Sequence, residues 1–287
     1  MGKEVFINPL TDFGFKRIFG EERNKALLIN FLNEIIEEER KIVDIEYQST
    51  FQTGIQEQNR KAVFDIFCKN DRGELFIVEM QKAKRSYFVD RSLFYSSFAI
   101  QKQAVKGKWD FNLKAVYAVA ILDFNLFDEM DGPSDFYIER IHLVRERTGE
   151  KYSNKLNLIF VELPKFQKEL HELTTNFKRW LYCLKNLPKL ESQPEEVRGE
   201  IFDELFQEAS INKLTEQDME TYRKSILEYD DVRDAVAYAE ETYYKKGWRE
   251  KAIAVATKLA ARHFPISDIS QITGMTPEEV KTIAAEE

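Results

Sequence analysis

The chain has 287 residues, of which 43% are hydrophobic and 32% are charged, and this length allows one large globular domain or two modest ones. The formal net charge of −8 argues against a surface coated for nucleic acid, but it is compatible with a local basic site. The two cysteines imply no disulfide framework, and the sequence shows neither a signal peptide nor the ~20 apolar residues of a membrane span, so we expect a cytoplasmic protein.

The N-terminal part is predicted to form two helices and a strand. Asn8 to Gly20 reads NPLTDFGFKRIFG, in which Thr11 or Asp12 can cap a short helix that the final glycine ends. Asn24 to Glu38 places its apolar residues on one side of a second helix. Ile42 to Phe51 alternates between apolar and polar residues, which predicts a half-buried strand.

The stretch from Lys61 to Lys82, KAVFDIFCKNDRGELFIVEMQK, predicts a β-hairpin. Two runs rich in Val, Ile and Phe are separated by turn-forming residues. A three-residue loop over residues 71–73 would put Gly73 in the left-handed conformation that closes such hairpins, and it would pair Asn70 with Glu74. Both faces of the hairpin are largely apolar, so we expect a buried, central hairpin that helices cover.

This register brings polar side chains together on one face. It places Asp65 opposite Glu79 and Val63 opposite Gln81, and Glu79 and Gln81 share a face because strand side chains alternate. Opposed side chains lie ~5 Å apart at Cβ, so two carboxylates and an amide would converge. The carboxylates would repel each other unless a cation lies between them or one is protonated, and paired oxygen ligands suit Mg²⁺ or Mn²⁺. The alternative is that Asp65 or Glu79 ends in a salt bridge at the rim of the sheet.

The chain after the hairpin adds a helix, more strands and then only helices. Tyr87 to Val105 is predicted to be helical, with an aromatic stripe that we expect in the core. Three more strands are predicted, at Lys114 to Leu122, Phe136 to Val144 and Leu156 to Leu163. From Phe166 onward the patterns are helical. Together these elements indicate an α/β protein with mixed strand directions.

Charge is unevenly distributed along the chain. From Gln81 to Lys108 there are seven basic residues and one acid, which gives +6. A basic segment directly after a carboxylate pair fits a polyanionic substrate, and the alternative is a solvated helix face. From Leu190 to Glu250 there are eight basic and seventeen acidic residues, which gives −9. With Pro188 to Pro194 as a candidate linker, we expect an acidic helical region over residues 188–287, separate from a domain over residues 1–187.

The C-terminal segment predicts a helical hairpin. Ile266 to Ile283 can form two short helices, the first ended by Gly274 and the second begun by Thr276 and Pro277. The pair resembles a helix-turn-helix. Because this piece is near neutral or acidic, we favour a hairpin for packing or dimerisation over a DNA reader, which leaves a homodimer open.

The order helix, three strands, helix, strand, together with several of these residues, resembles the Rpn-like, transposase-associated branch of the PD-(D/E)XK nuclease superfamily. The opening stretch from Asn8 to Lys16 is similar to that family's first motif, and the resemblance continues through Asp65 and the run from Val78 to Gln81. It covers Asn8 to about Phe166, and less clearly the helical tail. It implies a restriction-endonuclease fold, in which helices flank a mixed central sheet, here with a helical C-terminal extension.

The resemblance implies a metal-dependent DNA endonuclease of the recombination-promoting kind, with Mg²⁺ or Mn²⁺ as cofactor and no small-molecule cofactor. Asp65 and Glu79 match the two motif acids, so they are the expected metal ligands and catalytic residues. Gln81 is a third expected catalytic residue, and it stands where most of the superfamily has lysine; this branch resembles the glutamine variants. A divalent ion can polarise the phosphate and lower the pKa of an attacking water. The Gln81 amide supplies only hydrogen bonds, so the departure should weaken the site or shift work to a second metal.

Contacts to the DNA backbone are expected from Lys16, which lies in the opening motif, and from the basic residues that follow β-strand residue Gln81, namely Lys82, Lys84, Arg85 and Arg91. Many superfamily members add an acid from the first helix. Glu34 and Glu38 are candidates only by their helix positions, and Asp12 is interpreted as a helix cap.

Two alternatives to the enzyme are kept. One is a non-cleaving protein of the same fold, which binds DNA or a partner protein through its acidic helical tail; the acidic balance and the missing lysine favour it. The other is a structural α/β protein with an ion pair at the sheet rim. The presence of Asp65, Glu79 and Gln81 together favours the enzyme.

Overall fold

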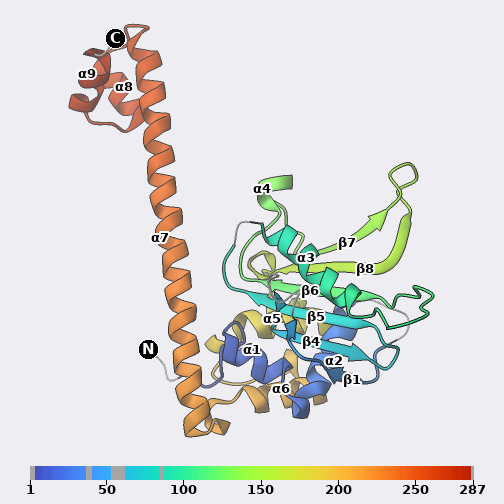
Figure 1. The fold of residues 1–287 in the computed structure, drawn as a ribbon. Helices are drawn as coiled ribbons and strands as arrows, with labels where there is room; N and C mark the ends of the chain where they lie inside the picture. The colour runs from blue at the N-terminus through green and yellow to red at the C-terminus, as the bar shows by residue number, and fades with distance from the viewer. Residues whose placement is uncertain (1–3, 37–40, 53–61, 85–86, 286–287) are drawn as a thin grey trace. The chain divides into compact units, whose positions relative to one another are not determined.

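The computed structural model describes residues 4–36, 41–52, 62–84 and 87–285, and its centre is a six-stranded mixed sheet (Figure 1). In spatial order the strands are β1 (Ile45–Tyr47), β4 (Ile66–Asn70), β5 (Leu75–Gln81), β6 (Val116–Leu122), β8 (Lys151–Glu162) and β7 (Ile138–Val144). Antiparallel pairs join β1 to β4, β4 to β5 and β8 to β7, whereas β5, β6 and β8 run parallel. A separate ladder pairs β2 (Phe51–Gln52) with β3 (Ala62–Val63). The expected mixed α/β arrangement is confirmed.

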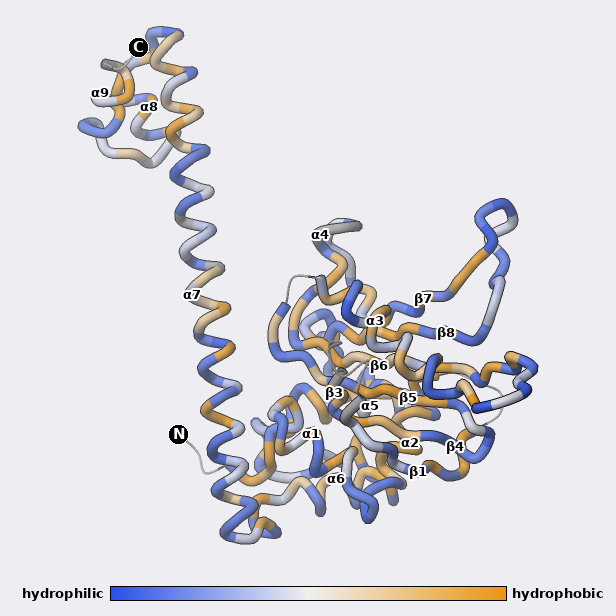
Figure 2. The backbone as a smooth tube through the Cα atoms, in the orientation of Figure 1, coloured by the Kyte–Doolittle hydropathy of each residue, from blue (hydrophilic) through white to orange (hydrophobic). Residues whose placement is uncertain are grey.

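Helices cover both faces of the sheet, as expected for strands that are apolar on both sides. One face packs on α1 (Asp12–Phe19), α2 (Lys25–Ile36), α5 (Asn176–Asn186) and α6 (Glu200–Ala209), and the other on α3 (Phe88–Gln101). The short α4 (Asp128–Asp131) follows β6. Figure 2 shows hydrophobic residues along the central strands between these layers. Single turns of 3-10 helix lie at Glu22–Asn24, Leu163–Lys165, Leu170–Glu172, Leu187–Lys189, Glu195–Val197 and Ile211–Lys213.

An aromatic cluster around Trp180 joins four helices beneath the sheet. The indole ring of this α5 residue is fully buried, and its centroid lies 5.6 Å from that of Phe19, 5.7 Å from that of Phe31 and 5.3 Å from that of Phe202. Its Nε1–H donates to Asn30 Oδ1 at 2.7 Å, which satisfies the one polar group of the ring. The helices that follow the last strand therefore belong to the same core as α1 and α2.

The chain divides into two compact units, residues 1–230 and residues 231–287. The predicted division between residues 187 and 188 does not coincide with this one, and the predicted linker Pro188 to Pro194 lies inside the first unit. The physical reason is burial: Leu187 and Val197, which flank that segment, are both fully buried, and α6 then packs on α1 and α2.

The long helix α7 (Glu216–Ala260) starts in the first unit and ends in the second, where α8 (Ile266–Thr273) and α9 (Pro277–Ala285) pack on its last turns. Gly274 ends α8 in the left-handed conformation, with φ 66°, as its position in the sequence predicted. The predicted helical hairpin is thereby confirmed as an element. Within the described ranges, no helix is long and apolar enough to cross a membrane.

Two other expectations need correction. The aromatic stripe of α3 is only partly in the core: Phe88 is buried, but Leu93 and Phe94 are each 45% exposed, because the outer side of the helix faces solvent. The strand predicted over Ile42 to Phe51 is interrupted, because only β1 pairs with the main sheet and the chain then turns to form β2.

Candidate active site

The β4–β5 hairpin has the predicted register at its closed end. Ile66 pairs with Val78, and Lys69 pairs with Leu75. The loop closes with Gly73 at φ 79°, the left-handed conformation that a glycine adopts without strain. The turn chemistry therefore fixes which side chains meet at the other end of the hairpin.

Asp65 lies where this ladder stops. The chain bends there, and the Phe64 N–H donates to the Thr50 carbonyl at 3.0 Å. The Met80 N–H donates to Asp65 Oδ2 at 2.9 Å. A side-chain oxygen thus replaces the main-chain acceptor that an antiparallel ladder would supply at this point, and the Asp65 carboxylate is held against β5.

The predicted pairing of Val63 with Gln81 is wrong. Val63 pairs with Phe51 in the β2–β3 ladder, because the bend at Asp65 turns the preceding residues away from β5. The error is confined to the residues before the bend, and the side-chain alternation of β5 is as predicted.

Glu79 is buried between β5 and α3, with 9% of its surface exposed. Its Oε2 accepts a hydrogen bond from Gln81 Nε2 at 3.3 Å and lies 3.9 Å from Arg91 Nη2. Its Oε1 is buried and has no hydrogen-bond partner among the described residues. The structure therefore brings Asp65, Glu79 and Gln81 to one place and leaves one carboxylate oxygen there uncompensated.

The electrostatics of the pair show an excess of negative charge. Burial, followed by the charge of Asp65, raises the pKa of Glu79 to about 8, against the smaller opposing effects of Arg91 and the Gln81 hydrogen bond. Burial also raises the pKa of Asp65, whereas the Met80 N–H lowers it. Two buried carboxyl groups with raised pKa values require either a proton or a nearby cation. A metal ion is one such cation.

Two of the predicted DNA-binding cations lie at this pair. Arg91 projects from α3, and its guanidinium carbon lies 5.4 Å from the ring centroid of Phe88 and 5.6 Å from that of Tyr95. Lys16 projects from α1, and its charge lowers the pKa of Asp65. The site thus draws its positive charge from the helices on both faces of the sheet.

The other three predicted cations follow β5 in the sequence. The Lys82 ammonium lies 6.0 Å from the ring centroid of Tyr229, on α7, and Lys84 is exposed. Arg85 lies outside the described residues. Lys82 and Lys84 are close in sequence to the carboxylate pair, but the contact of Lys82 is with α7.

The interpretation of Asp12 as a cap is wrong. Thr11 Oγ1 accepts the Gly14 N–H at 3.0 Å and caps α1. Asp12 Oδ1 lies 2.8 Å from Lys16 Nζ, and the charge of Asp12 raises the pKa of Asp65. Sequence reasoning missed this residue as part of the site, although its place in the opening motif was a signal.

The structure gives no support for a site role of the two other acids considered in the N-terminal helices. Glu34 is half-buried on α2. Glu38 lies outside the described residues.

The first turns of α7 hold the opening motif in place. Tyr222 Oη accepts the Asn8 N–H at 2.9 Å, and Ser225 Oγ accepts the Phe13 N–H at 3.1 Å. These contacts join residues more than 200 positions apart in the chain, so no local sequence pattern could predict them.

A third contact from α7 holds the end of β6. Tyr229 Oη donates to Asp123 Oδ2 at 2.6 Å, and the Asp123 N–H donates to the Gln81 carbonyl at 2.9 Å. The backbone of Gln81 is thereby connected to α7 through a chain of two hydrogen bonds.

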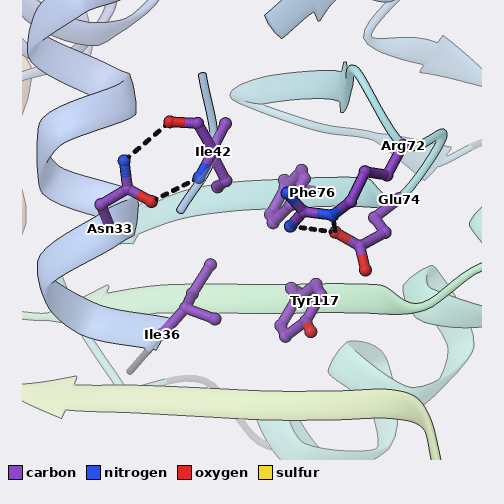
Figure 3. Close-up of a pocket in the computed structure, with 7 residues that line it drawn as sticks. All are labelled: Asn33, Ile36, Ile42, Arg72, Glu74, Phe76 and Tyr117. Carbon is purple, nitrogen blue, oxygen red and sulfur yellow. Dashed lines mark hydrogen bonds and ion pairs between the residues drawn. The ribbon is translucent and has the colours of Figure 1, made fainter. Parts of the chain in front are cut away.

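A hollow on the opposite face of the sheet is not a functional candidate (Figure 3). Arg72 Nη2 lies 2.7 Å from Glu74 Oε2. Asn33 exchanges two hydrogen bonds with the backbone of Ile42, at 2.8 and 2.9 Å. The hollow holds about 10 Å³, and its charged and amide groups are satisfied by each other and by the backbone.

The carboxylate pair fits a divalent cation with few protein ligands. Among the residues that the structure describes, no group of three or more His, Cys, Asp or Glu side chains is arranged to hold a metal. Mg²⁺ is commonly bound through one or two carboxylates, with waters and substrate phosphates completing its shell. Asp65 and Glu79 supply two, and the unpartnered Glu79 Oε1 is an oxygen that such an ion would satisfy.

Comparison with known proteins gives one match. A family model described as PD-(D/E)XK nuclease family transposase matches residues 9–239. No match was found among the curated proteins or among the solved structures. The matched range starts in the opening motif and ends within α7, and it includes Asp65, Glu79, Gln81 and Arg91.

Proposed function

Because the chain belongs to the PD-(D/E)XK nuclease family transposases, we propose that it is a Mg²⁺-dependent endonuclease that hydrolyses DNA phosphodiester bonds, of the transposase-associated, recombination-promoting type. The observation that carries this proposal is that Asp65 and Glu79 lie together near the C-terminal end of β5, where its pairing with β4 stops. Both carboxyl groups have raised pKa values, and Glu79 Oε1 is buried without a partner.

Each residue of the site has a part in this chemistry. A divalent ion held by Asp65 and Glu79 would polarise the phosphate and lower the pKa of the attacking water. The Met80 N–H fixes one oxygen of Asp65 and so orients the other. Gln81 donates to Glu79 and sets the orientation of that carboxylate, and it can redirect its amide to a water or to the substrate.

The substrate class follows from the positive charges around the pair. Lys16 and Arg91 influence the ionisation of Asp65 from opposite faces of the sheet, and phosphate groups are the natural ligands of such cations. Lys82 and Lys84, with Arg85, extend the positive charge along the chain after β5. The proposed substrate is therefore DNA. We place this activity in the cytoplasm and propose that it needs no organic cofactor.

One observation favours a non-cleaving DNA- or protein-binding protein of the same fold. Gln81 is neutral where most of the superfamily has a lysine, and a neutral hydrogen bond is about half as strong as a charge-assisted one. The acidic helical region from Leu190 to Glu250 would then be the surface for a partner.

Nicking of supercoiled plasmid separates the two functions. The parent protein and Asp65→Asn are incubated with plasmid in Mg²⁺, in Mn²⁺ and in EDTA. The proposal expects open-circular product from the parent with either metal, none in EDTA, and none from the variant. A parent that binds plasmid but leaves it supercoiled with both metals would establish the non-cleaving function instead.

A further inference from the structure

We propose that Arg91 is a catalytic residue of this site, which supplies from α3 the positive charge that a lysine at position 81 would supply from β5. The inference rests on the proposed nuclease function and names the residue that compensates for Gln81. It concerns the interaction of the Arg91 guanidinium with the non-bridging oxygens of the phosphate that is cleaved.

The position of the guanidinium is well defined. Its Nη2 lies 3.9 Å from Glu79 Oε2, a distance that brings the charges together but is too long for a hydrogen bond. The aromatic faces of Phe88 and Tyr95 hold the planar group from its own helix. Two aromatic rings of its own helix and the charge of Glu79 therefore hold Arg91 beside the carboxylate pair.

One donor of the Arg91 guanidinium, Nη2, makes no hydrogen bond within the described part of the chain. This nitrogen is buried, although buried donors are nearly always paired. Glu79 receives its hydrogen bond from Gln81 instead. A guanidinium nitrogen without a hydrogen bond lies beside a carboxylate with one oxygen that also lacks a hydrogen bond. This arrangement fits a site for a ligand whose oxygens can bind both a metal ion and an arginine.

The space beside these groups suits such a ligand. Glu79, Arg91 and Tyr95 border a cavity of about 20 Å³, which is enough for one water-sized group. Ala118 and Ala120 form part of its largely apolar wall, and Glu79 and Arg91 are the charged residues that line it. A phosphate oxygen or an attacking water can be accommodated there without displacing the core.

The chemistry needs a cation of this kind. In hydrolysis, a water oxygen forms a bond to phosphorus while the bond from phosphorus to one strand end breaks. One proton leaves the water for solvent, and the departing oxygen takes one up. The non-bridging oxygens carry more negative charge in the transition state, so a fixed guanidinium stabilises that state more than the ground state.

Three roles of Arg91 predict different measurements. A catalytic cation affects kcat at saturating DNA. A DNA-backbone contact affects KM and the salt dependence of binding. A purely structural counter-ion of Glu79 affects only the melting temperature. The conservative variant Arg91→Lys keeps the charge, and Gln81→Lys restores a charge from the neighbouring strand.

The test compares Arg91→Gln, Arg91→Lys and the double variant Gln81→Lys/Arg91→Gln with the parent. Lys106→Gln is the matched control, because it removes one positive charge from an exposed position in the same basic segment. Plasmid nicking gives kcat and KM, a gel shift in EDTA gives the affinity for uncleaved DNA, and thermal melting reports the fold.

We expect Arg91→Gln to lower kcat by about a hundredfold, the loss typical of removing one donor to a developing oxyanion, with DNA affinity in EDTA close to that of the parent. Arg91→Lys should lose less, and the double variant should recover part of the loss. Lys106→Gln should match the parent in kcat. If Arg91→Gln melts too early to be assayed, Arg91→Lys decides the question. A lowered kcat with the DNA affinity and melting temperature of the parent supports the inference, and a change in KM or melting temperature alone overturns it.

Arg91→Gln with the kcat of the parent overturns this inference and leaves the nuclease intact. A change in KM alone, or a double variant no better than Arg91→Gln, also overturns it. A parent that does not nick with Mg²⁺ or Mn²⁺ overturns the nuclease itself, so the two failures are distinguishable.

Discussion

The ionisation of Glu79 is coupled to Asp65, because the charge of Asp65 raises the pKa of the Glu79 carboxyl group. The burial of Glu79 is the larger cause, and the charge of Asp65 is the second. At neutral pH the metal-free site therefore holds a proton, with the apparent pKa values belonging to the pair. A divalent ion bound by the pair would replace that proton, so we expect metal affinity to rise with pH.

Removing the charge of Asp65 should abolish activity and spare the fold. Asp65→Asn keeps an oxygen that can accept the Met80 N–H, but it removes a charged ligand. We expect nicking in Mg²⁺ to fall by about a hundredfold or more. The metal-free variant should melt at a higher temperature than the parent, because repulsion against Glu79 is relieved. Parent-like cleavage by Asp65→Asn would show that Asp65 is not a ligand.

Glu79 should make the stability of the metal-free protein fall as the pH rises. Its pKa is 4.5 in the unfolded chain and about 8 in the fold, so between these values only the fold binds the proton. Stability is then present below pH 4.5 and is lost as the pH rises towards 8.

Glu79→Gln lacks this titration. The melting temperature of the variant minus that of the parent should therefore grow from pH 5 to pH 8, and Mg²⁺ should reduce the difference by stabilising the parent. We would measure both proteins by thermal melting in buffers of constant ionic strength. A difference that stays flat with pH would contradict the raised pKa.

At the scale of elements, the site is assembled from a hairpin, a bend and two helices, α1 and α3. The hairpin register was predictable, because the turn residues and the side-chain alternation are local. Gly73 closes the loop, and Glu79 and Gln81 share a face as expected. The bend at Asp65 was not predictable, because it depends on the pairing of β3 with β2 and on the hydrogen bond that the Asp65 side chain accepts from the Met80 N–H.

The positions of the site residues on the helices could not be predicted from local sequence either. Arg91 and Lys16 were selected as basic residues near a carboxylate pair, but sequence spacing did not distinguish them from Lys82 and Lys84. Their positions follow from how α1 and α3 pack on the two faces of the sheet. Asp12 was assigned to the wrong role, because a carboxylate at a helix start reads as a cap until a nearby threonine is seen to fill that position.

Helix α7 contributes stability to the site from outside it. Tyr229→Phe removes the hydrogen bond to Asp123, and we expect the free energy of unfolding to fall by about 1.5–3 kcal/mol, the usual range for a hydrogen bond to a charged group. Tyr238→Phe is the matched control, since Tyr238 is on the same helix and 72% exposed. Equal chemical denaturation midpoints for the two variants would show that α7 does not brace β6.

At the scale of the whole molecule, the described site residues all belong to the first compact unit. The second unit has its own small core, formed by α8 and α9 on the last turns of α7. The helical content of the C-terminal region was predictable from its patterns. Its division was not, because the burial of Leu187 and Val197 depends on side chains that are distant in the sequence.

A chain shortened to residues 1–239 should fold and keep the site. This length contains the first unit and the range that the family match covers. We expect one cooperative melting transition, together with nicking at a rate similar to that of the full chain. The same shortened chain with Asp65→Asn is the control for contaminating nuclease. Loss of nicking by a folded 1–239 chain would show that the second unit contributes to cleavage.

The central claim is that Asp65 and Glu79 together hold one divalent ion, and calorimetric titration of Mn²⁺ tests it most directly. The parent, Asp65→Asn and Glu79→Gln are each titrated at pH 7 in two buffers of different ionisation enthalpy. For the parent we predict one ion per chain and release of a proton, because Glu79 with a pKa of about 8 is protonated before the ion binds. Both variants should bind the ion far more weakly, and Glu79→Gln should release no proton. Equal binding by all three proteins, or no binding by the parent, would contradict the account.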